Sequence, residues 1–326
     1  GYFFPAIIVH FLLHLFRHYL SRYLIFTVPI LLMNNFTLYM IAAGKSALSM
    51  VCSITGGILN IVLDYVFISI LDMGIAGAAI ATGLGYSVTA VAGLVIFSKK
   101  DCLLHFVKPV CRIRTLVSAA SNGSSEMAAA LVTGIVTMMF NWTMLKYVGE
   151  NGVAAITIIM YVLMFATSLY TGYSYGVAPM ISFYYGEQNQ DKLKKLIRLS
   201  MKIIGFIGAA ALMISLAVTE PLVAIFARPD NPVYGLAVTG NRICSSALVF
   251  IGFNVFASGM FTALSNGLVS AVLAFSRSFV FMVAAMLILP AILGVTGAWL
   301  ATPAAEAAAF LLSAVMFIKY RRKYQY

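Results

Sequence analysis

The residues of this chain that could bind or transfer ions are the charged side chains inside its long apolar segments. Three carboxylates lie well inside such segments, Asp64, Glu126 and Glu306, and a guanidinium, Arg277, lies inside another. A charge at membrane depth is costly, so a charge found there is a candidate for ion or proton movement, or for a neutralised pair. The reaction that these residues could support is the binding and release of H⁺ or Na⁺.

Glu126 has the setting of a cation-coupling group. It lies about 18 Å along a helix from Arg114, and the neighbouring side chains of Asn122, Ser124 and Ser125 could solvate a cation or exchange protons through water. A carboxyl withdrawn from water can load and release a proton near neutral pH. The structural alternative is a carboxyl that its serines hydrogen-bond to hold the helix in place. The residues alone leave both interpretations open.

Arg277 and Glu306 are predicted to lie at the same depth. The turn between their segments centres near residue 292, and the two residues stand at similar distances on either side of it. Adjacent antiparallel helices would then bring them together, and either charge alone in lipid would be expensive. We favour a structural ion pair, with a part in transport as the alternative.

Asp64 lies nearer the outer end of its segment. It follows Asn60 by four residues, so both side chains are on one helical face. We favour a structural cap or a tether to the outer leaflet for Asp64, and an ion site is the alternative.

The composition places these residues in a helical membrane protein. The chain is 62% hydrophobic and 10% charged, with a mean hydropathy of +0.98, whereas soluble domains carry about 25% charged residues. The apolar runs are long and continuous, as membrane-spanning helices require. The cysteines are scattered without a C-x-x-C pair, and no nucleophile–base set supports an enzyme.

Apolar runs between polar breaks predict a short first segment at 1–16 and then nine longer spans. Most of the 21 Lys and Arg residues fall on one side of the resulting topology. The positive-inside rule makes that side, and the C-terminus, cytoplasmic. The net charge of +11 is therefore an orientation signal and does not indicate nucleic-acid binding. The nine spans are 20–43, 47–70, 75–98, 113–146, 151–183, 195–227, 235–262, 267–290 and 296–318.

An internal repeat organises these spans. The stretch GIAGAAIAT at 74–82 shares its pattern with GVTGAWLAT at 294–302, and the same gapless shift aligns Asn34 with Asn254. Three spans precede the second copy without a counterpart before the first. We therefore expect two six-helix lobes in the same orientation, of which the first lacks two spans and most of a third. The expected domains are a partial N-terminal lobe at 1–111 and a C-terminal lobe at 112–326.

The predicted fold class is thus an all-α integral membrane protein. It consists of two pseudo-symmetric six-helix bundles, the first truncated, with about nine to ten transmembrane helices in this chain.

Three stretches resemble the multidrug and toxic compound extrusion (MATE) family: 60–82, 121–134 and 172–198. The resemblance implies twelve helices in two lobes, with the chain running from the end of the third helix to the twelfth. It also implies export of amphipathic, often cationic compounds in exchange for Na⁺ or H⁺, and it favours a coupling role for Glu126. Some members carry a carboxylate in the tenth helix, whereas the matching span here, 235–262, has no Asp or Glu.

Amide, aromatic and thioether side chains are the candidates for a substrate cavity between the lobes. Such groups could form a polarisable wall for flat cations. For the two repeat-related asparagines we favour hydrogen bonding between helices, with a cavity role as the alternative. Most aromatic and Met side chains in so apolar a chain face lipid or pack. The candidates are Asn34, Asn254, Asn141, Tyr161, Tyr175 and Met138.

The sequence predicts a multi-pass multidrug-efflux antiporter of the plasma membrane, with a role in drug resistance. We expect a monomer whose partners are the lipid bilayer and small organic cations, with H⁺ or Na⁺ as the coupling ion and no other cofactor. Two alternatives stay open. A flippase for a lipid-linked sugar would favour several cavity cations facing a phosphate, and here Arg277 alone is available. The other alternative is an inactive fragment of such a transporter.

Overall fold

The chain is helical wherever the nine longer spans were predicted. The computed structural model describes residues 20–324, with gaps at 100–101, 103 and 109–112, and describes only the backbone of 114–130. The segment predicted at 1–16 lies outside the described residues. The first unit contains α2 (Thr27–Ala42), α3 (Ser46–Asp64), the π-helix η1 (Tyr65–Ile70) and α4 (Gly74–Phe97). No strand occurs among the described residues.

The remaining helices follow in chain order. They are α5 (Ile113–Tyr147), α6 (Glu150–Gly186), α7 (Gln190–Phe226), α8 (Pro232–Cys244), the 3₁₀ turn η2 (Ser245–Ala247), α9 (Leu248–Ala263), α10 (Gly267–Phe275), the π-helix η3 (Ser276–Phe281), α11 (Met282–Leu293) and α12 (Val295–Tyr324).

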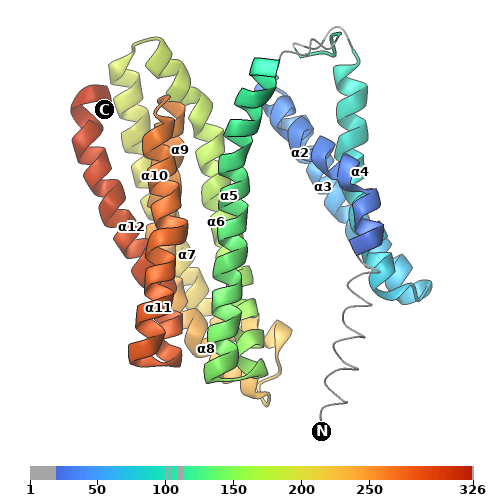
Figure 1. The fold of residues 1–326 in the computed structure, drawn as a ribbon, viewed down its shortest axis with the longest axis vertical. Coiled ribbons are helices and arrows are strands. Elements are labelled where there is room, and N and C mark those ends of the chain that lie inside the picture. Colours follow the sequence, from blue (N-terminus) through green and yellow to red (C-terminus); the bar gives the residue numbers. More distant parts are fainter. Residues whose placement is uncertain (1–19, 100–101, 103, 109–112, 325–326) are drawn as a thin grey trace. The chain divides into compact units, whose positions relative to one another are not determined.

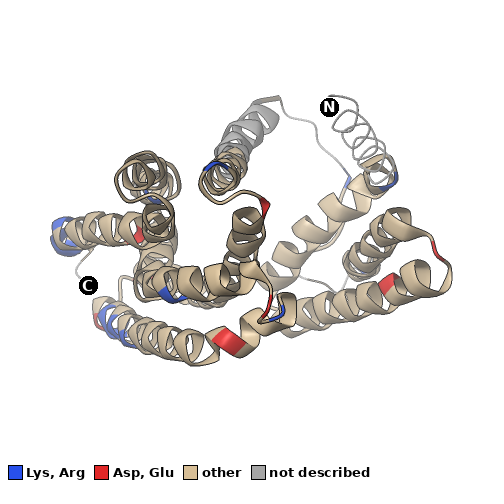
Figure 2. Cartoon of the chain, turned by 90° about the horizontal axis from the view of Figure 1, so that it is seen from below, with Lys and Arg blue, Asp and Glu red and all other residues tan. Residues whose placement is uncertain are grey.

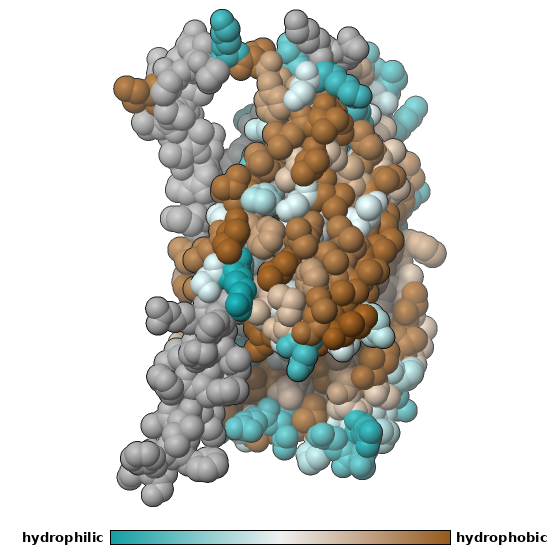
Figure 3. Space-filling view, turned by 90° about the vertical axis from the view of Figure 1, so that its right-hand side faces the viewer, coloured by the Kyte–Doolittle hydropathy of each residue, from teal (hydrophilic) through white to brown (hydrophobic). Residues whose placement is uncertain are grey.

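The helices have the length and surface of membrane spans. Within the described residues, seven continuous helical segments are long and apolar enough to cross a bilayer. Large apolar side chains such as Phe206, Ile225 and Ile318 are about three-quarters exposed, which water would disfavour and lipid tolerates. Figure 3 shows one face on which hydrophobic side chains form a continuous band between hydrophilic ends. The chain is an integral membrane protein.

The chain divides into two compact units, Gly1–Arg112 and Ile113–Tyr326. In the first unit α4 packs against both α2 and α3 (Figure 1). Small residues permit this close packing: Gly93 of α4 lies against the ring of Phe36 in α2, and Gly85 lies against Gly56 in α3. A Cβ added at Gly56 would lie 2.6 Å from the carbonyl oxygen of Gly85, so only glycine allows the two helices to approach this closely.

In the second unit α9 is central and contacts α6, α7, α10 and α12, while α11 packs along α12. One cluster of buried apolar side chains surrounds Trp299, and another surrounds Phe261. The hydroxyl of Tyr147 in α5 donates a hydrogen bond of 3.0 Å to the carbonyl oxygen of Pro290 in α11. This bond ties the first helix of the unit to the hairpin formed by α11 and α12.

The repeated G-x-x-G-A-x-x-A-T motif has the same structural role in each unit. Its first glycine adopts a positive φ, +53° at Gly74 and +59° at Gly294, where the chain turns between two helices. Its second glycine lies against the preceding helix, Gly77 against Phe67 and Gly297 against Leu289. The motif therefore makes a tight helical hairpin, once between η1 and α4 and once between α11 and α12.

Some helices extend beyond the apolar runs that predicted them. Helix α7 begins at Gln190 rather than 195, and α12 continues to Tyr324 rather than 318. The side chain of Asn189 caps α7 by accepting a hydrogen bond from the backbone N–H of Lys192. Hydropathy marks where a helix leaves the hydrocarbon, whereas capping and basic residues decide where the helix itself ends.

Candidate functional site

A buried ion pair lies in the second unit, where Arg277 of η3 meets Glu306 of α12. The guanidinium Nε donates to Glu306 Oε1 at 2.8 Å and to Oε2 at 3.1 Å. The side chains are 22% and 5% exposed, respectively. The predicted ion pair is therefore present, and each charge neutralises the other within an apolar helix bundle.

Asn254 completes the contacts of this carboxylate. Its Nδ2 donates to Glu306 Oε2 at 2.8 Å and to the Glu306 backbone carbonyl at 2.9 Å, while Ser313 Oγ donates to Asn254 Oδ1 at 3.1 Å. The interhelical role favoured for Asn254 is thus observed, since the bonds join α9 to α12. Both carboxylate oxygens of Glu306 therefore accept hydrogen bonds from described side chains.

A different arrangement lies in the first unit, around Asp64 at the end of α3. Asn60, one turn earlier, donates through Nδ2 to the hydroxyl oxygen of Thr82 in α4 at 3.4 Å. The Thr82 hydroxyl in turn donates to the carbonyl oxygen of Ala78 at 2.9 Å, so its proton is already used. Asp64 Oδ1 is buried and has no hydrogen-bond partner among the described residues.

The cap favoured for Asp64 is therefore wrong, whereas its role as a tether to the outer leaflet stays a prediction. The helix continues through Asp64 into η1 without a side-chain capping bond, because the residue sits inside a continuous helical segment. A buried carboxylate oxygen without a donor is unfavourable. Close packing at Gly56 and Gly85 holds α3 against α4 and fixes the face that carries Asn60. Asp64 Oδ1 therefore lies one helical turn from Asn60 as a buried acceptor to which no described residue donates.

Both ionisable centres coincide with a π-helical segment. Asp64 directly precedes η1, and Arg277 is the second residue of η3. Single π turns in α-helices often occur at functional sites, because they displace one side chain from the regular register and leave backbone groups strained. Hydropathy and residue spacing carry no signal for either π-helical segment.

For the other predicted coupling residue, Glu126, the structure describes the backbone alone. Glu126 lies in α5, and its side chain lies outside the described residues. Its coupling role stays a prediction.

The predicted cavity residues are not brought together by contacts within a unit. The hydrogen bond between helices favoured for Asn34 is wrong, because Asn34 is exposed and donates to the carbonyl oxygen of Ile30 on its own helix, at 3.0 Å. Asn141 is half-buried, and Tyr161 is exposed and stacks against Phe226. Tyr175 and Met138 are exposed by 64% and 74%. Their role as a substrate wall stays a prediction.

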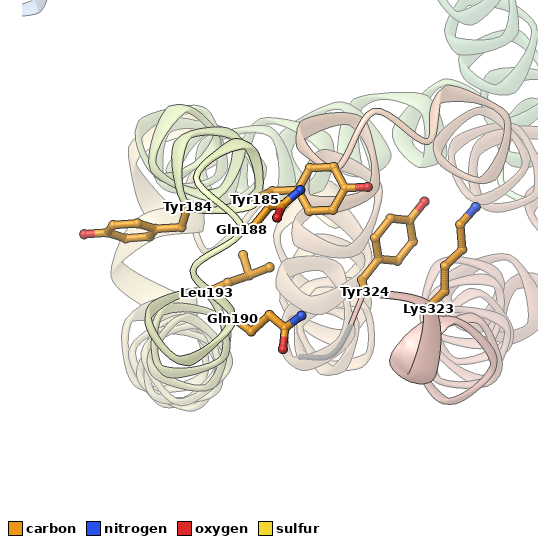
Figure 4. Close-up of a pocket in the computed structure, with 7 residues that line it drawn as sticks. All are labelled: Tyr184, Tyr185, Gln188, Gln190, Leu193, Lys323 and Tyr324. Atoms are coloured by element: carbon orange, nitrogen blue, oxygen red, sulfur yellow. The ribbon is translucent and has the colours of Figure 1, made fainter.

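Two described recesses lie at the end of the second unit that carries the C-terminus. One, of about 370 Å³, lies between the α6–α7 turn and the end of α12. Tyr185 and Tyr324 both line it and their rings meet edge to face with centroids 5.6 Å apart, and in Figure 4 Lys323 lies beside Tyr324. The other recess, of about 220 Å³, lies between α7 and α12. Figure 2 shows basic residues gathered close to the C-terminal mark. None of the predicted cavity residues lines either recess.

The family of this chain follows from its similarity to known proteins. The MatE family model matches residues 126–288, from the middle of α5 to the middle of α11. The chain belongs to the MatE family. This membership agrees with the resemblance found in the sequence and with the all-helical membrane fold.

Similar curated proteins include two named "Multidrug export protein MepA". That of Staphylococcus saprophyticus is 24% identical over 258 residues, which cover 78% of this chain and 56% of the relative. That of Staphylococcus haemolyticus is also 24% identical, over 282 residues that cover 86% of this chain and 61% of the relative. This MatE chain therefore spans about three-fifths of the length of these relatives.

Solved structures show the same fold. A MOP superfamily transporter from Pyrococcus furiosus, described as having a binding pocket of reverse polarity, matches with a TM-score of 0.85. It is 22% identical, and the match covers 95% of this MatE chain and 70% of that one. A MATE protein in complex with MaL6 matches with a TM-score of 0.84 at 24% identity, covering 94% and 69% of the two chains.

Sequence reasoning missed three residues of the two centres: Thr82, Asn60 as a hydrogen-bond donor, and Ser313. A signal for Thr82 was present. The turn between its helix and that of Asp64 lies near Asp72, so Asp64 and Thr82 stand at similar distances from it.

Proposed function

We propose that this MatE chain forms part of a cation-coupled antiporter that exports small amphipathic or cationic compounds across the plasma membrane. Family membership supports membrane transport, and the names of the MepA relatives support multidrug export as the class of activity. The C-terminus would face the cytoplasm, because the basic residues of α12 and of the start of α7 lie on that side of the topology.

One observation carries the coupling half of this proposal, namely the buried Oδ1 of Asp64, which accepts no hydrogen bond from the described residues. An ionisable group inside a membrane span is a functional candidate, more so when it lacks a partner. Arg277 and Glu306 neutralise each other, so their centre offers a cation no vacant acceptor. Asp64 offers one, on the helix whose Asn60 bonds to Thr82 of α4.

Coupling would follow from charge neutralisation. With a proton or Na⁺ bound, Asp64 is neutral and the α3–α4 contact is stable in lipid. Without the cation, the carboxylate requires water and favours a conformation in which the site is hydrated. The π-helical η1, which begins one residue later, is the segment where α3 can bend most easily. Glu126 would provide a second coupling carboxylate in the C-terminal lobe.

The test replaces Asp64 by Asn in the protein as expressed in cells, and measures efflux of a fluorescent organic cation. Asp64→Asn keeps the size of the side chain and removes the charge, so export should fall at least about tenfold. The matched control is Asp72→Asn, which makes the same change in the exposed α3–α4 turn. Asp72 has a φ of +50°, a conformation that Asn adopts readily. Undiminished export by Asp64→Asn at normal expression would remove Asp64 from the mechanism.

Export of lipid-linked sugars receives less support. A phosphate would require unpaired cations, and Arg277 is held by Glu306. The remaining alternative, an inactive fragment, predicts no efflux from cells that express this chain, with or without Asp64.

A further inference from the structure

A groove between α7 and α12 has a surface unlike the rest of the described bundle. Three cations and three apolar residues line it, contributed equally by the two helices. Lys194, Ile197 and Arg198 come from the start of α7, and Phe317, Ile318 and Arg321 come from the end of α12. Two segments more than a hundred residues apart in the sequence therefore converge on one small volume of about 220 Å³.

The cations of the groove have no acidic partners. Among the described residues Lys194, Arg198 and Arg321 form no ion pair, and no Asp or Glu lines the groove. All three are exposed. Like charges held around one recess repel one another, and a bound anion relieves this repulsion.

The apolar residues indicate what kind of anion fits. Ile318 is 75% exposed, and it lies three residues before Arg321, so its side chain and the guanidinium are neighbours on one helical face. Ile197 is buried at the base of the groove between Lys194 and Arg198. A soluble phosphate would use the cations and leave Ile318 uncovered. A lipid would use both, with its phosphate on the cations and the first carbons of its acyl chain on Ile318 and Phe317.

We propose that this groove binds the headgroup of an anionic phospholipid from the leaflet at the C-terminal end of the helices. Basic pockets between transmembrane helices are known sites for such headgroups. The neighbouring recess of Figure 4 is a poorer site, because tyrosines and glutamines line most of it and Lys323 is its one cation. The proposal does not depend on the transport activity or on Asp64.

The experiment measures binding of fluorescent phosphatidylglycerol to the purified protein in detergent. The double variant Arg198→Gln/Arg321→Gln removes two groove cations. The matched control, Lys202→Gln/Arg322→Gln, removes two exposed cations from the same helices outside the groove. Each cation next to an anionic headgroup raises the affinity of the protein for the lipid about fivefold. We therefore expect about twenty-fivefold weaker binding by the first variant and less than about twofold weaker binding by the second.

Competition separates lipid from other anions. Unlabelled phosphatidylglycerol should displace the probe, whereas phosphatidylcholine and inorganic phosphate at the same concentration should not. Equal losses in the two double variants would show attraction to overall charge and would overturn the proposal. Unchanged binding by Arg198→Gln/Arg321→Gln would do the same. Displacement by inorganic phosphate would assign the groove to soluble anions instead. Thermal unfolding of each variant checks that the bundle is intact.

Discussion

Asp64 and Glu306 are both carboxylates in membrane helices, but they differ in the number of hydrogen-bond donors around them. Glu306 receives bonds from Arg277 and Asn254, whereas Asp64 Oδ1 receives none from the described residues. The ion pair could be predicted because matching depth and opposite charge are visible in the sequence. The cap favoured for Asp64 failed because the number of donors around a buried oxygen depends on the packing of two helices, which spacing alone does not reveal.

The ion pair yields a prediction that separates structure from transport. Glu306→Gln leaves Arg277 in the bundle without its counter-charge, and should lower the free energy of unfolding by about 3 kcal/mol. The double variant Arg277→Met/Glu306→Leu removes both charges and should recover most of that loss. Thermal unfolding in detergent measures both.

Efflux by the double variant decides the role of the pair. Recovery of stability together with efflux is the expected result for a structural pair. If stability recovers and efflux does not, the pair belongs to the coupling machinery.

At the scale of elements, glycines decide how closely helices approach. Gly56 and Gly57 are neighbours in α3, but a Cβ at Gly56 would collide with the carbonyl oxygen of Gly85, whereas a Cβ at Gly57 meets nothing within 4 Å. Gly56→Val should therefore cost about 1–3 kcal/mol through overpacking, and it should reduce efflux because it separates Asn60 from Thr82. Gly57→Val carries the same helix propensity cost without the collision. Similar thermal stability of the two variants would contradict this packing.

The elements themselves were largely predictable, because apolar runs of about 20 residues have one stable solution in lipid. The nine longer predicted spans are each helical. What hydropathy could not reveal is detail that depends on hydrogen bonds: the cap at Asn189, the helical tail through Tyr324, and the π-helices η1 and η3. The repeated GIAGAAIAT pattern did predict a shared local structure, because a positive-φ glycine and a packing glycine at fixed spacing leave few alternatives.

At the scale of the whole molecule, we propose that this MatE chain belongs to an exporter driven by a cation gradient. The most direct measurement uses the purified protein in liposomes loaded with a fluorescent organic cation, with a Na⁺ or pH gradient imposed across the membrane. Movement of the dye should follow the gradient, stop when an ionophore collapses it, and be absent with Asp64→Asn. Dye movement that is equally fast with no gradient of either ion, or no movement under any gradient, would contradict the account.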